Sequence, residues 1–199
     1  MSNLCSFGGS RSLPDRFAPF VARVVAAWVA SGGFVSVGCA VGADAAVVSA
    51  FLSSPLSPVA LRVFCVGGPG PSGSLSGFWS GSALSVLSSL WSFFPSALRF
   101  WAGGPVSVPL RARLVRRSAA ALVGASSAVF FLASPSSPGS LRVAALAASR
   151  GVPVFVFPCG FSGAPAPLAG CVGRWVSASF CGFPCLAWSS SPAGQLALF

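Results

Sequence analysis

Short, almost wholly apolar segments alternate along most of this chain with longer segments of helical periodicity. The apolar segments lack the polar–apolar alternation of a half-exposed strand, so each predicts a strand buried on both faces of a sheet. These predicted strands are residues 3–9, 34–37, 60–66, 97–102, 128–133 and 152–158.

Helices are expected in the segments between these strands. Asp15 can cap the first helix, and Gly32 can end it; Pro138 can begin the last helix, and Gly151 can end it. The middle of the chain, residues 67–89, is rich in Gly and Ser and predicts a loop before one weaker helix. The predicted helices are residues 15–31, 43–54, 82–93, 108–126 and 138–151.

The alternation of buried strands with helices predicts the α/β class. Right-handed crossovers between parallel strands give a Rossmann-like, doubly wound, mainly parallel sheet with helices on both faces. We expect residues 1–158 to form this nucleotide-binding domain. Residues 159–199, rich in Pro, Gly and Cys, predict an irregular C-terminal tail with one strand at 174–180.

Gly/Ser-rich segments follow four of the predicted strands, at residues 8–12, 38–44, 67–73 and 134–140. Ligands of doubly wound sheets bind beyond the carboxyl ends of the strands. Small residues there let backbone N–H groups approach a phosphate. None of these loops is a Walker A loop, because the chain has no Lys, and none matches G-x-G-x-x-G.

The charge balance favours an anionic partner. All 12 basic residues are Arg, only 2 residues are acidic, and the formal net charge is +10. Nucleic acid or a phosphorylated small molecule fits this balance. The alternative is a compositional origin, because the missing residue types are those whose codons carry A at the first or second position. A reading frame without a selected function therefore also stays open.

Arginines cluster at residues 111–117. We expect Arg111 and Arg113 to lie on the solvated face of their helix, whereas Arg117 is a candidate anion ligand. Arg11, after the first strand, could pair with a phosphate or be an exposed loop residue.

Asp44 stands at the start of the second predicted helix in a chain with almost no acid. One interpretation is structural, because a carboxylate there satisfies free N–H groups and the helix dipole. The other is functional, because the carboxylate can accept hydrogen bonds from a ribose or base.

The remaining features indicate a cytoplasmic protein without a cofactor or metal. Ser, Gly and Pro interrupt the long uncharged segments, so no membrane span is expected, and the start of the chain lacks a secretory signal pattern. The 7 cysteines include no C-x-x-C pair and there is no His, which favours reduced thiols over a zinc site. Association into a homo-oligomer stays open.

Two segments carry a likeness to a known family. Gly9-Ser10-Arg11 follows the first strand, and "GCAVGADAAV", residues 38–47, follows the second. Together with Arg117-Ser118 and Gly139-Ser140 they resemble the Rossmann-like domain of DNA recombination-mediator protein A, the Smf-type DNA-processing group. The same superfamily includes the Lonely-guy phosphoribohydrolases and lysine-decarboxylase-like proteins.

The resemblance implies a binding protein for single-stranded DNA or phosphorylated nucleotides. It implies phosphate or nucleotide contacts at Gly9, Ser10, Arg11, Gly38, Gly42, Ala43, Asp44, Arg117, Ser118, Gly139 and Ser140. We assign no catalytic residue, because the chain has no His, Lys, Glu or Tyr and thus lacks the Glu of the P-G-G-x-G-T-x-x-E pattern. The alternatives are a nucleotide-ligand sensor and a phosphoribohydrolase-like enzyme of the same superfamily.

Overall fold

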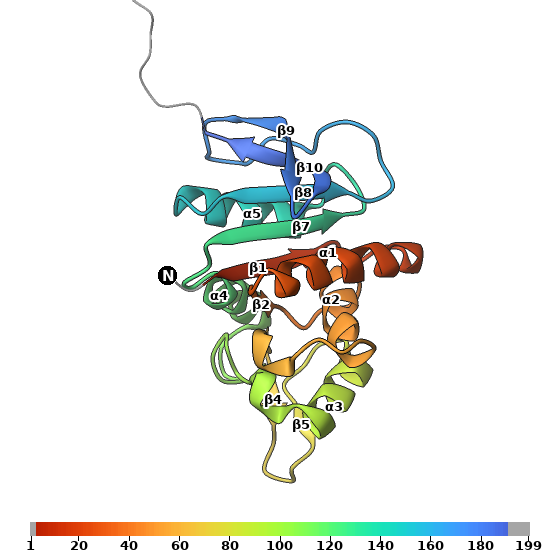
Figure 1. The fold of residues 1–199 in the computed structure, drawn as a ribbon. Helices are drawn as coiled ribbons and strands as arrows, with labels where there is room; N and C mark the ends of the chain where they lie inside the picture. The colour runs from red at the N-terminus through yellow and green to blue at the C-terminus, as the bar shows by residue number, and fades with distance from the viewer. Residues whose placement is uncertain (1–2, 191–199) are drawn as a thin grey trace, which may run out of the picture.

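The structure is a computed structural model that describes residues 3–190. Its centre is an eight-stranded sheet with the strand order β6-β3-β2-β1-β7-β8-β10-β9 (Figure 1). The pairs from β6 to β8 are parallel, whereas β10 runs antiparallel to both β8 and β9. A separate pair, β4 and β5, forms a small hairpin in the Gly/Ser-rich middle.

The strands are short and the helices span up to 13 residues. The strands are β1 (Leu4–Gly9), β2 (Phe34–Val37), β3 (Leu61–Phe64), β4 (Gly68–Pro69), β5 (Leu75–Ser76), β6 (Leu98–Arg99), β7 (Ser127–Leu132), β8 (Val154–Pro158), β9 (Arg174–Phe180) and β10 (Phe183–Ser189). The α-helices are α1 (Ala18–Ala30), α2 (Ala43–Leu52), α3 (Leu84–Phe93), α4 (Leu110–Ala121) and α5 (Pro138–Ser149). Three 3-10 turns are η1 (Asp15–Phe17), η2 (Pro58–Ala60) and η3 (Pro95–Ala97).

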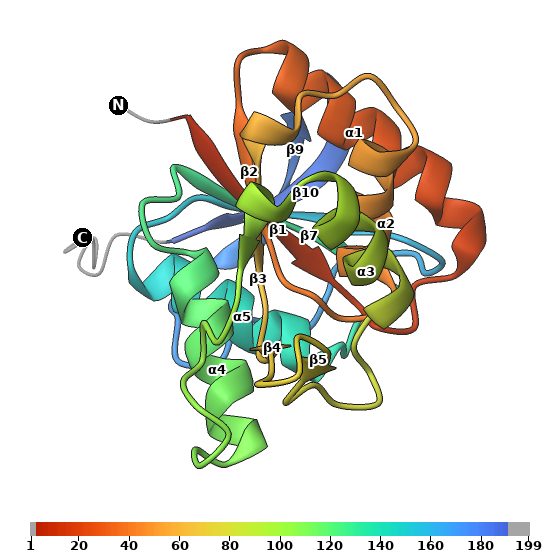
Figure 2. The same cartoon turned by 90° about the horizontal axis from the view of Figure 1, so that it is seen from below.

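Helices cover both faces of the sheet. Figure 2 shows α1, α2 and α3 on one side, and α4 and α5 on the other. Strand β7 shows why its sequence is apolar after its first residue: Val129 and Phe131 pack into the core under α1 and α2, while Phe130 and Leu132 pack into the core under α5. Because both faces of the strand are buried, apolar residues are favoured at successive positions.

These observations confirm the predicted fold class, a Rossmann-like α/β fold with a mostly parallel sheet. Each predicted strand and helix of residues 3–158 is present, with shifted ends. The first helix differs most, because η1 precedes α1 and no side chain caps either start, so the expected cap by Asp15 is wrong.

The chain after β8 is more ordered than the sequence indicates. The strand expected at residues 174–180 is β9, and β10 is an additional strand that joins it to the sheet in a hairpin. Phe180 at the end of β9 is buried against Phe7, Trp28 and Phe155. The hairpin thereby shares the main core of the molecule.

Within residues 3–190, no helix has both the length and the apolar character needed to cross a membrane. The same part of the chain contains no group of three or more His, Cys, Asp or Glu side chains that could hold a metal ion.

Candidate functional site

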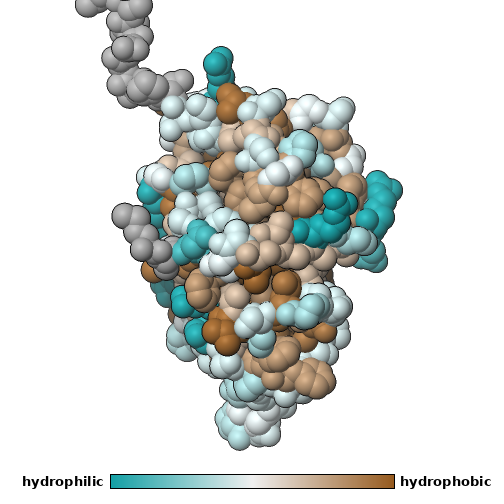
Figure 3. Space-filling view, in the orientation of Figure 1, coloured by the Kyte–Doolittle hydropathy of each residue, from teal (hydrophilic) through white to brown (hydrophobic). Residues whose placement is uncertain are grey.

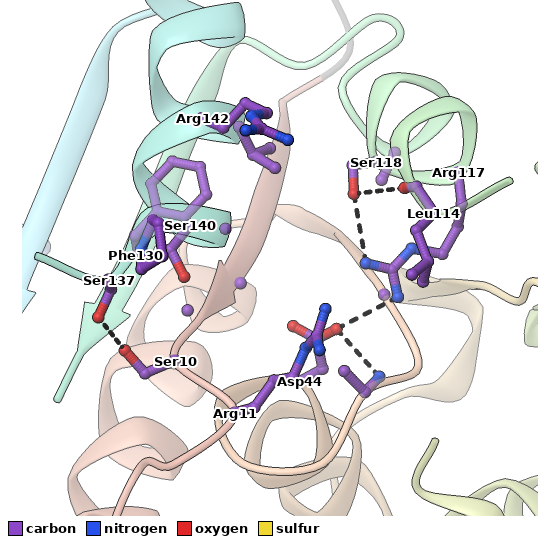
Figure 4. Close-up of a pocket in the computed structure, with 18 of the residues that line it drawn as sticks. Ser10, Arg11, Asp44, Leu114, Arg117, Ser118, Phe130, Ser137, Ser140 and Arg142 are labelled. Carbon is purple, nitrogen blue, oxygen red and sulfur yellow. Dashed lines mark hydrogen bonds and ion pairs between the residues drawn. The ribbon is translucent and has the colours of Figure 1, made fainter. Parts of the chain in front are cut away.

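A pocket of about 700 Å³ opens beyond the carboxyl ends of β1, β2 and β7. Helices α4 and α5 form its two side walls, as Figure 4 shows. In the sheet, β1 lies between β2, its successor along the chain, and β7, which follows much later, so the strand order reverses at β1. The pocket thus occupies the position where doubly wound sheets bind ligands.

The structure brings most of the predicted site residues together at this pocket. Those that line it are Gly9, Ser10, Arg11, Gly38, Asp44, Arg117, Ser118, Gly139 and Ser140. Gly42 and Ala43 are not among the lining residues. Gly42 has a φ of 77°, and a Cβ there would collide with the carbonyl oxygens of Ser10 and Arg11. The Ala43 N–H donates to the Ser10 carbonyl at 3.0 Å, which ties α2 to the loop after β1.

Ser10 joins the loops on either side of the pocket. Its hydroxyl is 2.6 Å from the Ser137 hydroxyl and accepts a hydrogen bond from the Ala133 N–H at 2.9 Å. The preceding residue, Gly9, has no room for a side chain, because a Cβ would collide with the Phe131 carbonyl oxygen. The conformation of these loops is therefore held by contacts within the protein before any ligand binds.

Asp44 lies at the base of the pocket and is 6% exposed. Its Oδ2 accepts a hydrogen bond from the Ala40 N–H at 3.1 Å and lies 3.7 Å from Nη1 of Arg117. The carboxylate does not cap the N–H groups of α2, so the structural interpretation is wrong in its detail. Burial raises the pKa of Asp44 above its usual range, opposed by the positive charges of Arg117 and Arg11 and by the Ala40 N–H.

Arg117 reaches from α4 to the end of β2. Besides Asp44, its guanidinium contacts Sγ of Cys39 at 3.9 Å and the Ser118 hydroxyl at 3.3 Å. Cys39 and Cys65 interact at the ends of neighbouring strands, and a hydrogen bond from Cys65, aided by Arg117, lowers the pKa of the Cys39 thiol to about 7. Nε of Arg117 is buried without a hydrogen-bond partner in the described residues. Arg117 is therefore a positioned cation rather than part of a solvated face.

The N-terminus of α5 faces the pocket without a side-chain cap. The N-cap residue is Ser137, but its hydroxyl bonds to Ser10 and to the Ser134 carbonyl instead of to the helix. The first backbone bond into the helix is donated by Leu141 to the Ser137 carbonyl. The N–H groups of Gly139 and Ser140 are thus left for an external acceptor.

The pocket is also lined by two arginines that the sequence did not indicate as site residues. Arg142 stands one helical turn after Gly139 on α5, and Arg111 stands on α4. With Arg11 and Arg117 they set four arginines against a single carboxylate. The guanidinium of Arg11 stacks over Trp79, 4.1 Å from the ring centroid, which fixes it at the rim. Arg142 could have been predicted from the sequence, because residues three apart on a helix lie on the same face, and Gly139 was already a candidate site residue.

The remaining wall of the pocket is apolar. It consists of side chains from α4, α5 and β7. The sequence predicts these two helices and this strand, but it does not indicate that their side chains share one surface. The side chains are Leu114, Val115, Ala121, Phe130, Val143 and Leu146. The pocket is thus cationic and polar at the strand ends and apolar between the two helices.

Arg113 corrects one expectation from the sequence. It is 7% exposed and does not lie on a solvated face. Its guanidinium donates to the carbonyl oxygens of Val108, Val66 and Gly77 at 3.1, 3.0 and 2.8 Å. Arg113 therefore anchors α4 to the middle of the chain and has no contact with the pocket.

The comparisons with known proteins found no matching protein-family model, no matching curated protein and no matching solved structure.

Proposed function

We propose that this protein binds the phosphate of a nucleotide-type ligand in the pocket and holds it without turnover. The observation that carries the proposal is the uncapped N-terminus of α5, which faces a cavity lined by four arginines. Helix N-termini favour anions because their free N–H groups and the helix dipole act together.

In this proposal, three neighbouring residues of α5 hold the phosphate. Gly139 and Ser140 offer free backbone N–H groups, and the Ser140 hydroxyl and Arg142 guanidinium lie beside the same cavity. A Cβ at Gly139 would have no atom within 4 Å, so the helix start is open to an incoming group. This arrangement matches the Gly/Ser loops that the sequence analysis assigned to phosphate contacts.

The size of the pocket favours a small ligand. A volume of about 700 Å³ lies in the range of small-molecule sites. The apolar wall between α4 and α5 offers a surface for a base. Figure 3 shows the opposite face of the molecule, which α1 and α2 cover, and hydrophilic side chains form separate patches on it.

Single-stranded DNA is the second candidate ligand, supported by the net charge of +10 and by the likeness to the recombination-mediator group. A phosphoribohydrolase-like activity has less support. General acid–base catalysis needs a group free to exchange a proton. Asp44 is the single carboxylate among the residues that line the pocket, and no His, Cys, Lys or Tyr stands beside it there as a second acid or base.

The proposal predicts that Gly139→Asp weakens ligand binding while the fold is kept. The new carboxylate would lie at the helix N-terminus, where it stabilises the helix and repels a phosphate. We expect at least roughly a tenfold loss of affinity for nucleoside monophosphates, measured by calorimetry, from a repulsion of about 1.4 kcal/mol.

The matched control is Gly139→Asn, which has nearly the same shape without the charge and should bind within about threefold of the unmodified protein. Affinity of the unmodified protein should also fall as salt rises. Equal binding by the Asp and Asn variants would overturn the proposal. Binding that requires an oligonucleotide and grows with its length would favour single-stranded DNA instead.

Cytoplasmic location and association into a homo-oligomer stay predictions from the sequence. Size-exclusion chromatography with light scattering, with and without nucleotide, measures the second.

A further inference from the structure

Asp44 presents one oxygen to the protein and the other to the pocket. Oδ2 is engaged by the Ala40 N–H and by Arg117. Oδ1 has no hydrogen bond within residues 3–190, and it lies 3.6 Å from where a Cβ of Gly8 would be. Gly8 and Asp44 both line the pocket, so Oδ1 faces the space where a ligand would lie.

The surrounding backbone leaves room for this carboxylate. A Cβ at Gly38 would collide with Oδ2 of Asp44 and with the Arg117 guanidinium. The side chain of Asp44 is 8% exposed, and its burial disfavours the charged form. Among the described residues, Oδ1 of Asp44 is not one of the buried polar atoms without a partner, so it stays open to the pocket. A ligand hydroxyl that enters the pocket can therefore donate to it.

The position of Asp44 restricts where a phosphate can lie. A carboxylate repels a phosphate, so the phosphate belongs at the N-terminus of α5. Figure 4 shows Asp44 on the opposite side of the cavity from Arg142, with Arg117 beside it. A ligand that uses both sides therefore carries an anion at one end and a hydrogen-bond donor some distance from it.

We infer that Asp44 accepts a hydrogen bond from a sugar hydroxyl, and that the pocket selects ribonucleoside monophosphates over their 2′-deoxy counterparts. A ribose joins a phosphate to hydroxyl donors, and acidic side chains hold ribose hydroxyls in dinucleotide sites of similar sheets. This inference rests on the proposed function. The proposed function requires that the pocket binds a phosphate, but it makes no distinction between ribose and deoxyribose.

The test compares the two nucleotide series on the unmodified protein by calorimetry. We expect each ribonucleoside 5′-monophosphate to bind at least about tenfold more tightly than its 2′-deoxy form, because a hydrogen bond to a charged group is lost. Equal affinities, or a preference for the deoxy series, would overturn the inference and leave phosphate binding intact. If neither series binds, the proposed function fails, and the inference falls with it.

Asp44→Asn tests the residue itself. The Ala40 N–H and Arg117 are both donors, so they orient the amide oxygen toward themselves and turn the amide NH₂, a donor, toward the pocket. The hydroxyl can then only accept a neutral hydrogen bond from the amide instead of donating to a carboxylate, so we expect the preference for the ribose series to fall to within about threefold. An undiminished preference in this variant would contradict the inference.

Asp15→Asn is the matched control, because it removes the same charge from an exposed turn outside the pocket. It should keep the full preference for the ribose series. If Asp44→Asn does not fold, as judged by circular dichroism, the comparison of the two nucleotide series on the unmodified protein still decides the inference.

Discussion

At the scale of single residues, the glycines around Asp44 explain how a carboxylate is accommodated in so apolar a chain. Gly38 leaves space for Asp44 and Arg117. The sequence identified Asp44 and Gly38 through their spacing, but their mutual contact depends on how β2 ends. The partner of Asp44 comes from α4, more than seventy residues later, and local sequence carries no information about that pairing.

Gly38→Ala should therefore destabilise the protein. The added methyl group would overlap both members of the ion pair, and overpacking of this kind costs about 1–3 kcal/mol in unfolding free energy. Gly139→Ala is the control, because its Cβ meets no atom within 4 Å, and we expect a change within about 1 kcal/mol. Urea denaturation of both variants measures the difference, and a Gly38→Ala protein as stable as Gly139→Ala would refute the steric argument.

At the scale of elements, α4 has two faces with different tasks. Arg117 and Ser118 face the pocket, while Arg113 points to the segment around the β4–β5 hairpin. Nothing in the sequence around Arg113 distinguishes it from its exposed neighbours on α4. Its acceptors are main-chain carbonyls, which are present at every residue and leave no mark in the sequence.

Arg113→Met should loosen this contact. The substitution keeps the aliphatic stem but leaves three carbonyl oxygens without their donor, so we expect a loss of about 2–4 kcal/mol in unfolding free energy. Arg116→Met, at an exposed position on the same helix, should change it by less than about 0.5 kcal/mol. Similar effects of the two changes would show that Arg113 does not anchor the helix.

At the scale of the whole molecule, the sheet could be predicted as far as β8 but not its last strand. Parallel strands buried on both faces have a continuous apolar pattern, which is why the segments up to residue 158 were recognisable. Strand β10 contains Pro184, a residue that argues against a strand. Its turn uses Cys181 at φ 51° and Gly182 at φ 83°, without the Asn-Gly or Asp-Gly pair that marks most such turns.

The β9–β10 hairpin should contribute to the stability of the whole domain. Phe180 contacts aromatic rings of α1, β1 and β8, so Phe180→Ala should lower the unfolding free energy by about 3–5 kcal/mol. Val172→Ala, at a side chain 71% exposed, is the control and should have little effect. A Phe180→Ala protein with unchanged thermal unfolding would mean that the hairpin is an independent appendage.

The central place of β1 also bears on how the chain is assembled during synthesis. β1 pairs on one side with β2, which follows closely, and on the other with β7, whose neighbouring Ser126 contacts Leu4 across 122 positions of sequence. During synthesis on the ribosome, β1 can pair with β2 soon after both have been translated. The other edge of β1 stays unpaired until β7 has been translated. A nascent chain that ends before β7 has an exposed apolar strand edge and an incomplete pocket, because the walls formed by β7 and α5 are missing. Ligand capture therefore follows the translation of α5, and a pause before that point leaves the chain most open to aggregation.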